Sequence, residues 1–150
     1  MTTLATSESP DETLRLGRRL APLLTSGDVV VLTGQLGAGK TLFVSGIAEG
    51  LGISERITSP TFLIARVYRG GFLPLVHADA YRLGSIAEFE DLGILDDGAD
   101  GAVVIEWGEA VADALPDDRL IVRFELDGDA RNVTFEPCGS WCDRDLAVVA

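Results

Sequence analysis

Apolar and polar residues follow one another in a pattern that predicts alternating helices and strands. Val29 to Thr33 is a short continuous apolar stretch of β-branched type, which is typical of a buried parallel strand. After it, apolar side chains recur at helical spacing up to Leu51, and Gly52 stands where a C-cap glycine belongs. Before it, Pro10 is placed to open a helix with acidic residues in its first turn. Residues 10 to 52 therefore predict a helix, a strand and a second helix.

The second half of the chain predicts further strands and one short helix. The segments are a hairpin turned by Arg69-Gly70-Gly71 (62–68 and 72–79), a helix opened by the capping box Ser85-Ile86-Ala87-Glu88 and reaching Leu92, a buried strand (102–107) and an antiparallel pair (120–126 and 132–135). We therefore expect one α/β domain over residues 1–150, with its core at about 10–135. Its central sheet should be mixed, with helices on both faces and an added antiparallel hairpin. The residues after Pro137 show no informative pattern.

The turn between the first predicted strand and the second helix carries a phosphate-binding motif. Residues 34–41 read Gly34-Gln35-Leu36-Gly37-Ala38-Gly39-Lys40-Thr41 and match G-x-x-x-x-G-K-[ST] at every fixed position. The glycines allow successive backbone N–H groups to converge on one anion, and the helix N-terminus behind them favours phosphate. The lysine can contact the β- and γ-phosphates, and the threonine hydroxyl can ligate Mg²⁺. The motif predicts a P-loop (Walker A) protein that binds a nucleotide with magnesium.

Two carboxylates stand at predicted strand ends, the edge at which open α/β sheets bind ligands. Asp79 ends an apolar run and can hold Mg²⁺ directly or through water, and Glu106 ends the strand over residues 102–107. Beside a phosphate loop, such a strand-end carboxylate is typical of the acidic residue on the magnesium side, where Asp is usual. Glu109 is an alternative for this role, and His77 is interpreted as structural rather than catalytic.

Two further segments allow a functional or a structural interpretation. Ser59-Pro60-Thr61 can be a switch that senses the γ-phosphate, or only a loop that enters a strand. Glu12 and Thr13 can flank the nucleotide base because their helix precedes the phosphate-loop strand, or they can only cap that helix. The pattern alone leaves both questions open.

Composition narrows the classes of function. The chain has 12 Lys and Arg against 24 Asp and Glu, a net charge of −12, so we expect no DNA binding and no large nucleic-acid surface. An acidic surface that only favours solubility explains the same charge. No apolar run approaches the roughly 20 residues of a membrane helix, and the N-terminus lacks the features of a signal peptide. We therefore expect a cytoplasmic protein, in which Cys138 and Cys142 are ordinary thiols.

Several of these motifs together resemble the TsaE (YjeE) family. The phosphate loop, Ser59-Pro60-Thr61, His77-Ala78-Asp79-Ala80-Tyr81-Arg82, Asp91-Leu92-Gly93 and Ile105-Glu106-Trp107 occur in the order and spacing of that family, over about residues 10 to 135. The resemblance implies a small bacterial cytosolic ATPase that uses ATP and Mg²⁺. It also implies two partner proteins, TsaB and TsaD, with which such proteins make threonylcarbamoyladenosine next to the anticodon of tRNA. The tRNA would then be reached only through the partners.

The resemblance further implies roles for individual residues. The catalytic set would be Lys40, Asp79 and Glu106, and the magnesium ligands would be Thr41, Glu106 and Asp79. Ser59, Pro60 and Thr61 would form the switch, and Trp107 would lie near the nucleotide as an intrinsic fluorescent reporter. The nucleotide-binding residues would be Gly34, Gly37, Ala38, Gly39, Lys40, Thr41, Leu42, Glu12 and Arg131.

Two loop residues depart from the family pattern. Gln35 replaces a usual acidic residue in the variable part of the loop, from which little follows. Leu42 replaces a usual second Thr, and this would remove one hydrogen bond to the α-phosphate, on the order of 1 kcal/mol. We therefore expect weaker nucleotide binding, not its loss.

Three functions are compatible with the sequence. The first is an ATPase that is slow alone and dependent on partners, because no arginine finger can be assigned among Arg66, Arg69 and Arg82. The second is a nucleotide-gated binding module whose hydrolysis is incidental. The third is a small-molecule or nucleotide kinase, which the lack of a basic lid segment disfavours. The choice of ATP over GTP rests on the resemblance, since the chain has no N-K-x-D-type guanine-reading element.

Overall fold

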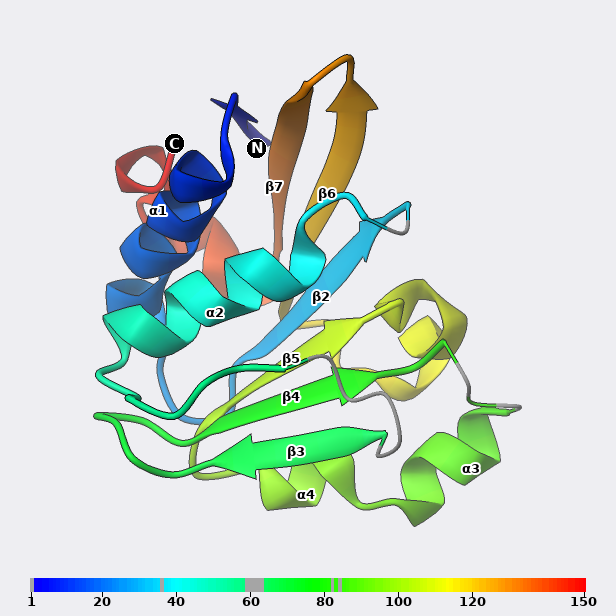
Figure 1. Cartoon of the computed structure of the whole chain (residues 1–150). Coiled ribbons are helices and arrows are strands. Elements are labelled where there is room, and N and C mark those ends of the chain that lie inside the picture. The colour runs from blue at the N-terminus through cyan, green and yellow to red at the C-terminus, as the bar shows by residue number, and fades with distance from the viewer. Residues whose placement is uncertain (1, 36, 59–63, 82, 84) are drawn as a thin grey trace.

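A computed structural model describes every residue of the chain except 1, 36, 59–63, 82 and 84 (Figure 1). The described part contains one sheet, whose strands are β1 (Thr3–Ser7), β2 (Val29–Gly34), β3 (Ala65–Tyr68), β4 (Leu75–Asp79), β5 (Ala102–Glu106), β6 (Arg119–Asp127) and β7 (Ala130–Cys138). Its α-helices are α1 (Pro10–Leu20), α2 (Lys40–Gly50), α3 (Ile86–Asp91) and α4 (Ile94–Asp97). Short 3₁₀ helices are η1 (Ala21–Leu23), η2 (Gly108–Ala114), η3 (Gly139–Asp143) and η4 (Leu146–Val148).

The sheet is parallel in its centre and antiparallel at both edges. Its strand order is β1-β7-β6-β2-β5-β4-β3. The four central strands, β6, β2, β5 and β4, run parallel, while β7 and β1 extend one edge and β3 the other in antiparallel pairs. The carboxyl ends of β2, β5 and β4 therefore meet at one edge, on the right of Figure 1. The predicted mixed sheet with an added hairpin is confirmed.

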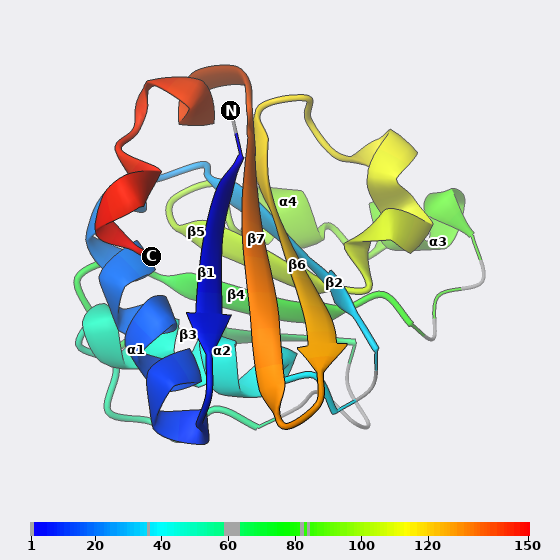
Figure 2. The same ribbon diagram turned by 90° about the horizontal axis from the view of Figure 1, so that it is seen from above.

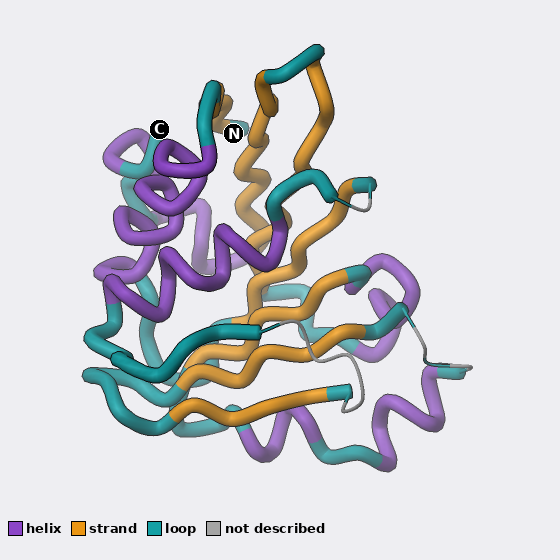
Figure 3. Tube along the Cα trace, in the orientation of Figure 1, coloured by secondary structure: helices purple, strands orange, loops and turns teal. Residues whose placement is uncertain are grey.

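Helices cover both faces of the sheet, as predicted. In β2 the side chains of Val30 and Leu32 pack in the core under α1 and α2, and those of Val29 and Val31 pack under α3, α4 and η2. This alternation follows from the period of two in a strand and explains why β2 is apolar on both sides. Figure 3 shows helices on both sides of the strands.

Two glycines bring α1 and α2 into backbone contact. A Cβ on Gly46 would lie 2.2 Å from the carbonyl oxygen of Leu14, and one on Gly17 would lie 2.3 Å from that of Phe43. Any larger residue would force the helices apart. The close packing fixes α1 against the helix that follows the phosphate loop, and thus fixes the start of α1 beside that loop.

The helix ends agree with the sequence signals. Ser9 caps α1 by accepting a hydrogen bond from the Glu12 N–H, and Ser85 caps α3 in the same way through the Glu88 N–H. Gly52 follows α2 at φ +81°, and the N–H of Ile53 bonds to a carbonyl of the last turn. No helix within the described ranges is long and apolar enough to span a bilayer.

Some strand bounds differ from the prediction. The strand expected from residue 72 begins only at Leu75, because Pro74 has no N–H to donate and Phe72 lies in the exposed turn, with its own N–H bonded to Leu51. The strand expected from Phe62 is described only as β3, from Ala65; residues 62 and 63 lie outside the described part. The strand expected to reach residue 107 ends one residue earlier.

Two parts of the fold were not anticipated from the sequence. β1 adds an edge strand that pairs with β7, 124 to 132 residues later in the chain, from Ser7 opposite Arg131 to Thr3 opposite Phe135. The segment after β7 folds back beside α1 (Figure 2), where Trp141, Leu146 and Val149 are buried in the same core as α1 and α2. The C-terminal segment is therefore part of the packed structure.

Candidate functional site

The phosphate loop forms a tight turn that only glycine can make at three places. Gly34, Gly37 and Gly39 have φ values of +142°, +81° and +105°. At Gly34 a Cβ would also meet the carbonyl oxygen of Phe124 at 2.7 Å. Gly39 is the N-cap of α2 and has no side chain to satisfy the first N–H groups of the helix, which remain available to an anion. Figure 3 shows the loop between β2 and α2.

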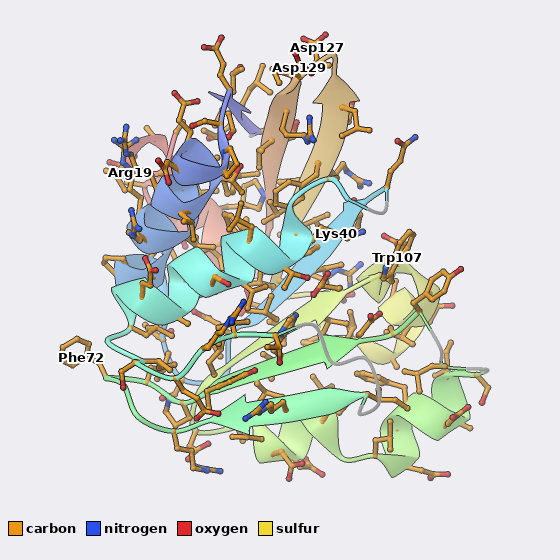
Figure 4. All side chains as sticks on the ribbon, in the orientation of Figure 1. Arg19, Lys40, Phe72, Trp107, Asp127 and Asp129 are labelled. Atoms are coloured by element: carbon orange, nitrogen blue, oxygen red, sulfur yellow. The ribbon has the colours of Figure 1, made fainter. Side chains whose placement is uncertain are left out.

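Lys40 is buried and turned back onto its own loop. Its side chain is 4% exposed, and its Nζ donates hydrogen bonds to the carbonyl oxygens of Gly34 and Gln35. Nζ also lies 3.8 Å from the centre of the Trp107 ring; both residues are labelled in Figure 4. Burial lowers the pKa of Lys40, and the negative charges of Glu106, Glu109 and Asp79 oppose this shift. The ammonium group thus lies within a set of carboxylates.

The register of β4 and β5 places three polar side chains on one face of the sheet. Asp79 lies opposite Glu106, and His77 lies opposite Val104. Because side chains two residues apart share a face, His77, Asp79 and Glu106 all point to the face that α2 covers. Strand-end polar residues therefore converge beneath the start of α2.

Glu106 is the centre of this group. It is 4% exposed, and the hydroxyl of Thr41 donates to its two carboxylate oxygens at 3.3 and 3.2 Å. The Nε2 atom of His77 lies 2.5 Å from Glu106 Oε2. Asp79 is oriented by a hydrogen bond from the Tyr81 N–H to its Oδ1, 2.9 Å long. The structure thus brings together the loop threonine and the carboxylates predicted as metal ligands.

Two cavities flank the loop, one of about 250 Å³ and one of about 190 Å³. The one above β5 has about 250 Å³ and is lined by Gly37, Gly39, Lys40, Thr41, Leu42, Asp79, Glu106 and Trp107. Its hydroxyl and carboxylate oxygens are the hard ligands that Mg²⁺ prefers. Among the described residues, no group of three or more His, Cys, Asp and Glu could hold a metal ion by itself. This donor set suits an ion that arrives with phosphates, since Mg²⁺ is usually bound by one or two carboxylates plus substrate oxygens.

The second cavity, about 190 Å³, lies between the loop, α1 and the β6–β7 hairpin. It is lined by Ser7, Glu8, Ser9, Pro10, Thr13, Gly37, Ala38, Gly39, Leu42, Asp129 and Arg131. Thr13 is fixed there by a 2.7 Å hydrogen bond to Ser7 and packs close to Gly39. Arg131 contributes from the hairpin, whereas the carboxylate of Glu12 accepts a hydrogen bond from the Glu8 N–H at the start of α1. Of the two residues predicted near a base, Thr13 lines the cavity, whereas the Glu12 carboxylate bonds to the backbone that precedes α1.

The outcome differs among the remaining candidate residues. Ser59, Pro60, Thr61 and Arg82 are outside the described residues. Arg66 pairs with Glu55 at 2.6 Å, and Arg69 pairs with Asp100 at 3.3 Å near the amino end of β4, the end opposite to Asp79. Glu109 is exposed and lines a third, shallow cavity of about 490 Å³ together with Gly34, Gln35, Trp107, Phe124, Glu125 and Leu126.

Two contacts were not found from the sequence. One is the hydrogen bond between His77 and Glu106, which depends on β4 and β5 being neighbours in a given register. The other is the packing of Tyr81 on Trp107, with ring centres 5.1 Å apart. Among the described residues Trp107 is the one non-glycine with positive φ, +60°, and this turns its ring out of the strand direction toward Lys40. An H-x-D sequence at one strand end and I-E-W at another was the available signal.

Comparison with known proteins gives consistent matches over most of the chain. A family model described as "Threonylcarbamoyl adenosine biosynthesis protein TsaE" matches residues 7–133. A protein of Streptomyces coelicolor, "tRNA threonylcarbamoyladenosine biosynthesis protein TsaE", is 46% identical over 144 residues, covering 90% of this chain and 97% of that protein. A Bacillus subtilis protein of the same description is 42% identical over 135 residues, covering 88% and 84%. The crystal structure of Bacillus subtilis YdiB matches with a TM-score of 0.79 and 32% sequence identity, over 95% of this chain and 93% of that one.

Proposed function

The chain belongs to the TsaE family, and on that premise we propose that it is a Mg²⁺-dependent ATPase serving the biosynthesis of threonylcarbamoyladenosine in tRNA. The observation that supports the ATPase function is the convergence of Lys40, Thr41 and Glu106 on one cavity at the start of α2. We further propose that it acts in the cytoplasm with TsaB and TsaD, which hold the tRNA. Its net charge of −12 supports the view that it does not bind the tRNA by itself.

The groups of the site can share the work of phosphoryl transfer to water. The N–H groups of the loop and the Lys40 ammonium would bind the β- and γ-phosphates. Thr41 and Glu106 would hold Mg²⁺, which when bound neutralises charge on the phosphate oxygens, and Asp79 would orient an attacking water or a water of the ion. Transfer by this route depends mainly on positioning and charge, and no described arginine reaches the cavity lining. We therefore propose slow hydrolysis by the chain alone and a faster reaction with its partners.

Nucleotide binding should change the environment of Trp107. Lys40 has to exchange the carbonyl oxygens of Gly34 and Gln35 for phosphate oxygens, and Nζ then moves relative to the Trp107 ring. The other tryptophan, Trp141, is buried in the C-terminal segment and supplies a constant background. ATP should therefore change the fluorescence of the wild-type protein and leave that of a Trp107→Phe variant unchanged.

The second cavity supports a place for the nucleoside. It adjoins the same glycines as the first cavity, so a nucleotide with its phosphates on the loop can extend into it. Thr13 and Arg131 would then contact the ribose or base, and Leu42 would pack against it without the hydroxyl that a Thr would offer.

The experiment measures ATP hydrolysis by the purified chain alone, and then with TsaB, TsaD and tRNA, beside a Lys40→Ala variant. The proposal predicts slow hydrolysis alone, stimulation by the partners and loss of both in the variant. Nucleotide-dependent binding to the partners without stimulation would instead identify a gated binding module. If the chain neither bound the partners nor was stimulated by them, that result would contradict the proposal.

A further inference from the structure

We propose that His77 is a positioning residue that orients the carboxylate of Glu106 toward a magnesium ion. The inference rests on the proposed function, because it concerns the metal ligand of the same site, and it assigns a role to a residue interpreted from the sequence as structural. The observation behind it is the contact of 2.5 Å between His77 Nε2 and Glu106 Oε2.

The contact lies in a fully buried place. His77 is 0% exposed and Glu106 is 4% exposed. Val104, opposite His77 on β5, and Leu75, two residues before it on the same face of β4, are buried and apolar, whereas Arg66, opposite it on β3, is exposed and pairs with Glu55. An apolar side chain at position 77 would fit this face of the sheet. A polar ring here has to be compensated by a hydrogen bond, and Glu106 is the group that supplies it.

The direction of this hydrogen bond follows from the acceptor character of a carboxylate. An ionised carboxylate can only accept, so Nε2 is the donor and the ring is in the tautomer with its hydrogen on Nε2. Nδ1 has no hydrogen-bond partner among the described residues, which suits a bare nitrogen better than a second N–H. No lysine or arginine among the described residues is hydrogen-bonded to Glu106, so its oxygens are not saturated by a permanent cation.

The two partners of Glu106 differ in what happens when a cation enters. Thr41 shares its hydroxyl between both carboxylate oxygens at 3.3 and 3.2 Å. As a magnesium ligand Thr41 would turn that oxygen to the ion, and its hydrogen bonds to Glu106 would no longer keep their present geometry. His77 does not face the cavity lined by Thr41 and Glu106, so its bond to Oε2 can persist and leave Oε1 for the ion. Partners of this kind, behind a metal ligand, typically change metal affinity by about 10–100-fold when removed.

The test measures the Mg²⁺ concentration that half-saturates the Trp107 fluorescence change in the presence of ATP. His77→Leu should raise this concentration by about 10–100-fold, while ATP binding in EDTA stays at the wild-type level. His77→Gln, whose amide nitrogen reaches a position near that of Nε2, should restore most of the Mg²⁺ affinity. Leu75→Ala is the matched control, because it weakens the same strand and the same core two residues away and should leave the Mg²⁺ requirement unchanged.

Each outcome decides the inference. An unchanged Mg²⁺ requirement in His77→Leu, or an equal shift in Leu75→Ala, would overturn it while leaving the proposed function intact. Wild-type protein that binds ATP without any Mg²⁺ effect would overturn both. If His77→Leu does not fold, His77→Asn is used in its place. The Asn side chain is too short to reach Glu106, so the His77→Asn protein should need more Mg²⁺ than the His77→Gln protein.

Discussion

Asp28 and Glu106 are two buried carboxylates at opposite ends of neighbouring parallel strands, and they differ in the kind of partner that they bind. Asp28 precedes β2 and is 7% exposed; Glu106 ends β5 and is 4% exposed. Asp28 receives both ends of the Arg144 guanidinium at 2.6 and 2.8 Å and also the Thr25 N–H at 2.7 Å. In contrast, the described structure gives Glu106 hydrogen bonds from the Thr41 hydroxyl and the His77 imidazole and none from a lysine or arginine; Lys40 acts on it only through its charge.

The difference shows that burial alone does not distinguish a carboxylate that stabilises the fold from one that belongs to a binding site. A carboxylate whose oxygens are saturated by a guanidinium fixes one arrangement of the chain, since any movement leaves a buried charge without a partner. A carboxylate bonded to a hydroxyl and an imidazole, with no guanidinium on its oxygens, gains most from a ligand that is itself positive. Asp28 therefore belongs to the fold and Glu106 to the site.

The largest predicted effect concerns Arg144, which ties the C-terminal segment to the loop before β2. Its guanidinium stacks 3.9 Å from the Trp141 ring centre as well as binding Asp28. Arg144→Met should lower the free energy of unfolding by about 3–5 kcal/mol, because Asp28 would stay buried without a counter-charge. Denaturant unfolding measures this. Arg69→Met is the control: its partner Asp100 is exposed, so the change should be under about 1 kcal/mol, and equal losses in both would refute the comparison.

Replacing each of the two carboxylates by its amide tests the comparison further. In Asp28→Asn the amide NH₂ meets donors of Arg144 or Thr25, and we expect a loss of about 2–3 kcal/mol of unfolding free energy. In Glu106→Gln the partners are a hydroxyl and an imidazole, which adapt to an amide, and we expect a change below about 1 kcal/mol. Thermal unfolding of the two variants compares them directly. A greater loss in Glu106→Gln would reverse the assignment of the two carboxylates.

The smallest effect lies at the exposed start of the C-terminal segment. The N–H and hydroxyl of Ser140 donate to Asp118 at 2.8 and 2.7 Å and lower the pKa of Asp118 below its usual 3.8. Because the folded pKa is the lower one, this stabilisation is present above the unfolded pKa and is lost as the pH falls through the folded pKa. Ser140→Ala should therefore be less stable than wild type at pH 7, with a difference that shrinks in acid. A difference that is constant from pH 7 to pH 2 would contradict this cause.

The loop and its surroundings could be predicted because their signals are local. Three glycines, a lysine and a threonine within eight residues define the turn, and the strand and helix on either side have their own periodicity. The edge strand β1 gives no such signal. It is short, its residues are mostly small or polar, and its pairing with β7 joins Thr3 to Phe135. The Asp28–Arg144 pair could not be predicted either, because its two residues are 116 positions apart and no local pattern links them.

The site could be predicted as a set of residues but not as a set of contacts. Lys40, Thr41, Asp79 and Glu106 were each found from a motif or a strand end, and the fold brings them to one cavity. The bond of His77 to Glu106 depends on which strand lies beside β4 and in which register the two strands pair. The pattern of apolar residues does not determine either. The helical pattern offered both Glu12 and Thr13 and the family resemblance favoured Glu12, but the packing of α1 against the loop places Thr13 in the cavity.

The most direct test of this account is calorimetry of ATP binding with and without Mg²⁺, on the wild type, Glu106→Gln and Arg144→Met at a temperature where all three are folded. We predict that Mg²⁺ strengthens binding by at least about 10-fold in the wild type and in Arg144→Met, and has little effect in Glu106→Gln. A Glu106→Gln protein that keeps the full Mg²⁺ effect, or an Arg144→Met protein that loses it, would contradict the division between the two carboxylates.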